Sequence, residues 1–181
     1  MITTEEIYQA KIQLYKLLYE HWKTQELFTH SWWGMIMFII FLYIFVFYLI
    51  DKKRFLQIMF FGSLMAVSGS VIDAIGTSYV LWSNSIRFFP ITPGLFLYDL
   101  TAIPLYYMLA YQYTSSWISF VLWSTIISTI YSLIFLPFLA VFKIYTNHSW
   151  NNIYFIPMLL GVSILARIIV LKIMKIEKDA N

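Results

Sequence analysis

Hydrophobic residues gather in five long runs separated by short polar segments. Each run is about as long as the ~20 residues that an α-helix needs to cross the hydrocarbon core of a bilayer. The runs cover roughly residues 32–50, 55–82, 95–113, 117–142 and 153–174. Pro104 and Pro137 lie inside the third and fourth runs and predict a kink in each helix. The pattern therefore predicts an all-α polytopic membrane protein, with five transmembrane helices over residues 31–176 and a short cytoplasmic tail at 177–181.

Residues 1–30 follow a different pattern. Thr3 and Glu6 have the spacing of a capping box, which predicts that a helix begins there. Apolar and aromatic residues then recur at helical spacing, with polar residues on the opposite side: Tyr8, Ile12, Tyr15, Tyr19 and Trp22. We predict an external amphipathic helix lying in the headgroup region of the membrane. A lid over the outer mouth of the bundle, or a helix that docks a partner, are the alternatives.

Composition supports the membrane class and removes several others. The chain is 61% hydrophobic and 12% charged, whereas about a quarter of the residues of a soluble domain are charged. The absence of cysteine excludes disulfides and thiolate chemistry. The three histidines are scattered, so we expect no metal site and no cofactor. The net charge of +3 comes from residues at the ends of hydrophobic runs, which argues against a nucleic-acid partner and for membrane lipids.

The basic residues also predict an orientation. They form two clusters, one between the first two spans and one at the end of the fifth: Lys52, Lys53 and Arg54, and Arg167, Lys172, Lys175 and Lys178. With five spans both clusters fall on one side, which the positive-inside rule makes cytoplasmic. The N-terminus and the loops near 83–94 and 143–152 are then outside, in a multi-pass protein of the cytoplasmic membrane. We expect Arg167 to extend its side chain towards the cytoplasmic surface.

The second span carries an acid on a stripe of very small residues. The stripe has steps of four, three, four and three residues, so its members share one helix face: Gly62, Ala66, Gly69, Asp73 and Gly76. Small residues let a second helix pack closely in lipid, and a carboxyl group there requires a partner or a function. Asp99 stands near the start of the third span, across the same external loop. A hairpin of these two spans would bring both acids to a similar depth.

We therefore predict an outward-facing polar pocket between the second, third and fourth spans. Asp73 is the key acid and Asp99 its partner, and the residues expected to contact a ligand are Ser70, Thr77, Tyr79, Trp82, Arg87 and Tyr106. Desolvated carboxyl groups can donate protons, and aromatic faces can stabilise a cation. Such a pocket suits a lipophilic or amphipathic small molecule.

Three classes of function stay open at this stage. The protein is a membrane-embedded acid-catalysed enzyme, a transporter or sensor that only binds its ligand, or an accessory subunit of an oligomer or of another protein. In the last case Asp73 only holds helices in register through a hydrogen bond. Asp99 could equally be a first-turn residue favoured by the helix dipole.

Several motifs resemble an uncharacterised family of small multi-span membrane proteins from endospore-forming Gram-positive bacteria. The most specific is the D-x-x-G pattern at Asp73–Gly76 followed by Trp82; the others include residues 51–54, Asp99, Pro104 and Tyr111–Tyr113. The resemblance implies a bacterial membrane protein and carries no activity with it. In architecture alone the chain is also similar to small integral-membrane terpenoid cyclases, which use intramembrane acids to protonate a prenyl chain.

Overall fold

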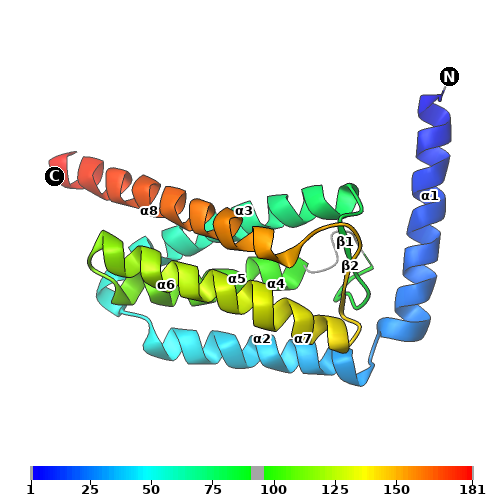
Figure 1. Cartoon of the computed structure of the whole chain (residues 1–181), viewed down its shortest axis with the longest axis horizontal. Coiled ribbons are helices and arrows are strands. Elements are labelled where there is room, and N and C mark those ends of the chain that lie inside the picture. The colour runs from blue at the N-terminus through cyan, green and yellow to red at the C-terminus, as the bar shows by residue number, and fades with distance from the viewer. Residues whose placement is uncertain (1, 91–95, 181) are drawn as a thin grey trace.

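A computed structural model describes residues 2–90 and 96–180, and within them the protein is a bundle of helices (Figure 1). Residues 91–95, which include the end of one predicted loop and the start of the third predicted span, lie outside the described part. Four described segments are long and apolar enough to cross a membrane, namely His30–Leu49, Lys52–Ser78, Trp117–Val141 and Asn152–Ala180. They contain α2 (His30–Leu49), α3 (Phe55–Ser78), α6 (Trp117–Ile130) with α7 (Leu136–Val141), and α8 (Phe155–Ala180).

The third hydrophobic run is divided into two helices. α4 (Phe96–Leu100) and α5 (Ala102–Tyr113) meet at Thr101, whose backbone angles, φ −127° and ψ −73°, interrupt the helix. α5 packs against α3, α2 and α6 and is the most deeply buried helix of the bundle. Irregular backbone at membrane depth is tolerated where protein surrounds it.

This break changes which tyrosines face inward. A continuous helix would align Asp99 with Tyr106 and Tyr113, but these two are 37% and 65% exposed. Tyr107 and Tyr111 are buried instead, because the interruption at Thr101 shifts the helical register.

The kink predicted at Pro137 takes the form of a widened turn. Between α6 and α7 the chain makes a π-helical segment, η3 (Tyr131–Phe135), in which the Leu136 N–H donates to the Tyr131 carbonyl. Proline lacks an N–H and crowds the preceding turn, so the ladder of hydrogen bonds adjusts upstream of it. Single π-turns of this kind occur frequently at functional sites.

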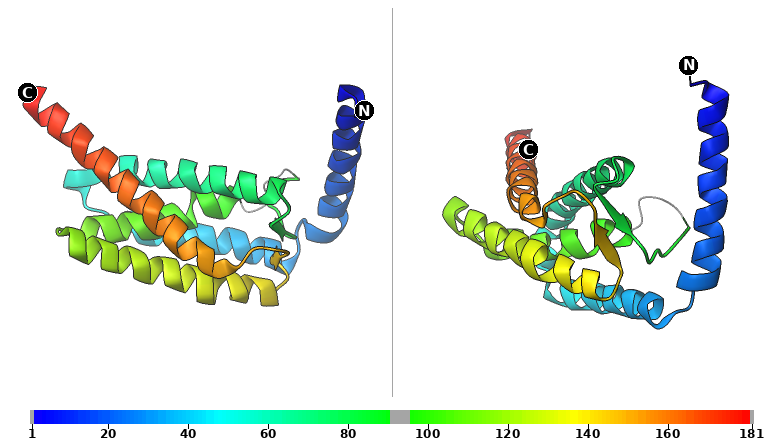
Figure 2. Two further views of the ribbon diagram at one scale, coloured as in Figure 1. Left: turned by 45° about the horizontal axis from the view of Figure 1, so that its top comes forward. Right: turned by 45° about the vertical axis from the view of Figure 1, so that its right-hand side comes forward.

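The two ends of the bundle differ in their polar features. At one end β1 (Trp82–Asn84) pairs antiparallel with β2 (Tyr145–Asn147), so the two loops predicted to share a side of the membrane do lie together. The basic turn η2 (Lys52–Arg54) and the C-terminus of α8 lie at the opposite end (Figure 2). The relative placement of the loops and basic clusters is thus as predicted.

The N-terminal arm is a helix that stands apart from the bundle. α1 (Thr4–His21) runs transverse to the bundle helices at the end that carries β1 and β2 (Figure 1). The predicted capping box is present: the Glu6 N–H donates to Thr3 Oγ1 at 3.2 Å, and the Thr3 N–H donates to Glu6 Oε2 at 2.7 Å. The hydrogen bond from the Thr3 backbone lowers the pKa of Glu6. None of the residues of α1 is buried.

The side chain of Arg167 is buried. The expectation that it extends to the cytoplasmic surface is therefore wrong. Its guanidinium donates to the Ser115 carbonyl at 3.1 Å and to Thr114 Oγ1 at 3.3 Å, just beyond the C-terminus of α5. The guanidinium carbon lies 4.5 Å from the centre of the Phe120 ring. The free carbonyls at the end of a buried helix require donors, and Arg167 supplies them.

Candidate functional site

The small-residue stripe of α3 is where the bundle packs most closely. A Cβ added at Gly62 would collide with Met108, and one at Gly76 would collide with the Trp82 indole. A Cβ at Gly69 would lie 3.7 Å from Cβ of Asp99. Gly62 and Gly76 therefore let a neighbouring side chain reach the α3 backbone, whereas a side chain at Gly69 would make only ordinary van der Waals contact with Asp99. Ala66 is half-buried and lines a groove towards α5.

Asp73 is held by the tryptophan that follows its helix. The Trp82 indole N–H donates to Asp73 Oδ1 at 2.7 Å, and both side chains are buried. Leu81 N–H bonds to the Gly76 carbonyl, which folds the chain back so that the indole lies over α3. Glycine at position 76 leaves the space that the indole occupies.

Asp73 and Asp99 line one small cavity, so the two predicted acids are brought together. The cavity measures about 20 Å³ as the space open to the centre of a water molecule, enough for roughly one water. Its other lining residues are mostly aromatic or aliphatic: Gly69, Ile72, Trp82, Ile103, Tyr131, Tyr145, Phe155 and Leu159. The two carboxyl groups lie within electrostatic range of each other. We call this space the acid cavity.

The polar atoms around the acid cavity are incompletely paired. Asp73 and Asp99 are 6% and 5% exposed, and within the described ranges Oδ2 of each has no hydrogen-bond partner. Asn84 of β1 is 3% exposed and lies within hydrogen-bonding range of the Asp73 carboxyl group. Buried polar groups in proteins are nearly always hydrogen-bonded, so the two carboxyl oxygens without a partner suggest a binding role.

Tyr145 of β2 forms part of the wall at the end of the cavity. Burial, and to a smaller extent the charge of Asp73, raises the pKa of this phenol well above its ordinary value. The hydroxyl stays protonated and donates to Asn152 Oδ1 at 3.1 Å. Tyr145 therefore closes the cavity as a neutral aromatic group.

A larger apolar chamber adjoins the acid cavity. It measures about 240 Å³ on the same scale and shares Ile103 and Tyr131 with the smaller space. Its remaining walls come from α4, α5, α6 and η3: Tyr98, Ala102, Tyr106, Tyr107, Ile127, Ile130 and Phe135. We call this space the tyrosine chamber. A cavity with two carboxyl groups beside an apolar chamber has the division expected of a site for an amphipathic molecule.

The predicted ligand contacts are only partly brought together. Trp82 lines the acid cavity and Tyr106 lines the tyrosine chamber. Thr77 bonds to the Asp73 carbonyl within α3, and Ser70 is half-buried away from both spaces. Tyr79 is 75% exposed, so its prediction as a lining residue is wrong.

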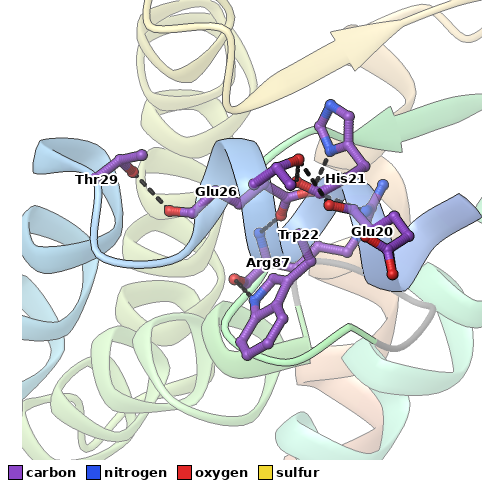
Figure 3. Close-up of polar contacts among 7 residues, drawn as sticks. Glu20, His21, Trp22, Glu26, Thr29 and Arg87 are labelled. Atoms are coloured by element: carbon purple, nitrogen blue, oxygen red, sulfur yellow. Dashed lines mark hydrogen bonds and ion pairs between the residues drawn. The ribbon is translucent and has the colours of Figure 1, made fainter.

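Arg87, the remaining predicted contact, belongs to a different polar cluster that joins α1 to the bundle (Figure 3). Glu26 is 1% exposed and accepts from the Arg87 guanidinium at 2.9 Å and from the Arg87 N–H at 2.6 Å. His21 Nδ1 lies 2.7 Å from the same carboxylate. The Trp22 indole donates to the Arg87 carbonyl at 3.1 Å. We call this cluster the Glu26 joint, and it fixes the root of α1 to the loop after β1.

Several important residues were missed from the sequence. Asn84 and Tyr145 come from the two loops that pair as β1 and β2, and Phe155 begins α8. Tyr131 begins the π-helical segment η3 and lines both cavities. No periodicity marks these positions, because loop pairing and a local π-turn leave no repeat in the sequence.

No known protein family model matches this chain, and neither a curated protein nor a solved structure is significantly similar to it.

Proposed function

We propose that this chain is a multi-pass protein of a bacterial cytoplasmic membrane that binds a lipophilic or amphipathic small molecule between α3, α4, α5 and α6. The observation that carries the proposal is that the acid cavity and the tyrosine chamber have two wall residues in common, Ile103 and Tyr131. An apolar body would lie among the tyrosines, and a polar group would reach Asp73 and Asp99. The proposal also includes membership of the uncharacterised family of small membrane proteins from endospore-forming bacteria.

The proposed topology has five spans, with α4 and α5 together forming the third. The basic residues of η2 and the α8 C-terminus would be cytoplasmic and α1 external. The transverse course of α1 at the opposite end supports an amphipathic helix lying along the outer membrane surface (Figure 1). Tyrosine and tryptophan on α1 favour the headgroup region.

The absence of cysteine makes this topology directly measurable. Single cysteines at Ser115 and Ser149 would be treated in intact cells with a membrane-impermeant maleimide. We expect labelling at Ser149 without permeabilisation, and at Ser115 only after it. Equal labelling of both positions in intact cells would refute the five-span arrangement.

The binding proposal is tested by filling the tyrosine chamber. Ile127→Trp places an indole in the chamber, and Ile126→Trp places one on the exposed face of the same helix. Native mass spectrometry of both variants in mild detergent should show a defined small molecule retained by the wild type and by Ile126→Trp. Ile127→Trp should lose it while remaining folded. Equal retention by both variants would contradict binding in the chamber.

An acid-catalysed membrane enzyme, cyclase- or isomerase-like, is the second candidate, favoured by the two interacting carboxyl groups beside an apolar chamber. If the protein is an enzyme, Asp73→Asn retains the bound molecule but stops its conversion. If it is a carrier or sensor, the same change alters affinity alone. An accessory subunit would lose only stability.

A further inference from the structure

The acid cavity has two carboxyl groups and no basic residue to balance them. Within the described residues no lysine, arginine or histidine lines it. Arg87 is engaged by Glu26, and Arg167 lies at the opposite end of the bundle against Thr114 and Ser115. Buried carboxylates without a counter-charge are costly, so the cavity favours a positively charged occupant or a bound proton.

The unpaired atoms of the cavity match a hydrogen-bond donor with several N–H groups. Oδ2 of Asp73 and Oδ2 of Asp99 have no N–H or O–H donor in the described part of the chain, but the two carboxyl groups lie close enough to share one proton. A bound ammonium group would take the place of that proton. A primary ammonium group has three N–H donors in fixed directions and is similar in size to a water molecule. The cavity holds roughly one water, so it would accept this group and would exclude a trimethylated one.

The cavity walls add a second attraction for a cation. The rings of Trp82 and Phe155 lie 5.0 Å apart, and those of Tyr131 and Phe155 lie 6.0 Å apart, so they form a continuous aromatic lining. Ring faces attract ammonium groups, most strongly where water is excluded. A neutral alcohol would form hydrogen bonds in the cavity. It would gain neither the cation–π attraction of the rings nor the charge attraction of the carboxylates.

We infer that the acid cavity binds the primary ammonium group of an amphiphilic amine whose hydrocarbon chain lies in the tyrosine chamber. This inference rests on the proposed function, because it names the polar end of the molecule that the chamber would bind. The chain would pass between Ile103 and Tyr131, the two residues common to both spaces. Asp73 and Asp99 would accept from the ammonium group while Trp82 keeps Asp73 in place.

The test uses one alkyl chain with different head groups. The full-length protein in phosphatidylcholine nanodiscs at neutral pH would be titrated with dodecylamine, dodecanol and dodecyltrimethylammonium, with bound ligand measured by native mass spectrometry. We expect dodecylamine to bind at least tenfold more tightly than either of the others. Asp99→Asn should reduce dodecylamine affinity at least tenfold, and the exposed Asp179→Asn should leave it unchanged.

The outcomes separate this inference from the proposal on which it rests. Equal binding of dodecanol and dodecylamine would overturn the amine inference and leave a lipophilic site in place. Absence of binding by all three ligands would contradict both. If the protein unfolds less readily in sodium chloride than in choline chloride, and dodecylamine has no effect on its stability, the cavity binds a metal cation and the amine inference is wrong. If Asp99→Asn fails to fold, Asp73→Asn serves instead, because asparagine can still accept from Trp82.

Discussion

Trp82 offers the sharpest test of how the bundle keeps a carboxyl group in its interior. Trp82→Phe removes the indole N–H that donates to Asp73 Oδ1 at 2.7 Å and leaves a smaller ring in the same place. With Asp73 ionised, loss of this hydrogen bond costs about 1.5–3 kcal/mol. The smaller ring adds about 1–2 kcal/mol by leaving a cavity. We therefore expect the free energy of unfolding to fall by about 2.5–5 kcal/mol.

Trp32→Phe is the matched control. Trp32 is 8% exposed, but its indole N–H has no hydrogen-bond partner within the described ranges. Its replacement removes the same ring atoms and breaks no bond, so it should cost at most about 1–2 kcal/mol. Equilibrium unfolding in mixed dodecyl maltoside and dodecyl sulfate micelles, followed by far-ultraviolet circular dichroism, compares the two variants directly. Equal unfolding midpoints would refute the role given to the Trp82 N–H.

A double-mutant cycle then reports the charge on Asp73. In the Asp73→Asn background the bond from Trp82 is made to a neutral acceptor, which is worth only about 0.5–1.5 kcal/mol. Trp82→Phe should then destabilise less than it does in the wild type if Asp73 is ionised. The same cost in both backgrounds would mean that Asp73 is neutral in the folded protein.

Three further substitutions probe other parts of the fold. Arg167→Met leaves the carbonyls beyond α5 without donors, so it should destabilise the protein by about 2–4 kcal/mol in the same unfolding assay. The control is Lys172→Met at an exposed position, which should change stability by less than about 0.5 kcal/mol. Glu26→Gln removes the charge that holds Arg87 and should speed tryptic cleavage within α1; an unchanged digestion rate would show that the ion pair does not fix this helix. Gly76→Ala would collide with the buried indole and lower the unfolding midpoint, while Gly161→Ala meets open space and should stabilise by up to about 1 kcal/mol.

The features that were predicted correctly depend on periodicity or on length. Long apolar runs have few stable environments other than a bilayer, and four of them form long, continuous helical segments. The steps of four and three along the second run placed Gly62, Gly69, Asp73 and Gly76 on one buried face. Asp99 lines the same cavity as Asp73, although the connection that separates it from the end of α3 is long and contains β1.

The features that were missed depend on contacts between distant segments. The break at Thr101 divides the third span, and on the helix that follows it Tyr106 and Tyr113 are partly exposed. Arg87 was predicted to contact the ligand, but its guanidinium and its backbone N–H both bond to Glu26 of the N-terminal arm. An ion pair of this separation has no signal in a single sequence.

The pairing of β1 with β2 has a consequence for how the protein is made. A membrane protein is inserted from its N-terminus, so Asp73 and Asp99 enter the bilayer before Tyr145 and Phe155 have been synthesised. During that interval neither acid has its complete aromatic enclosure, and both depend on Trp82, on lipid headgroups or on the insertion machinery for polar contacts. The enclosure is completed only when the last helix arrives. A chain truncated before β2 would therefore present two incompletely covered carboxyl groups within the membrane. Quality-control proteases could use these exposed groups to distinguish unfinished from finished molecules.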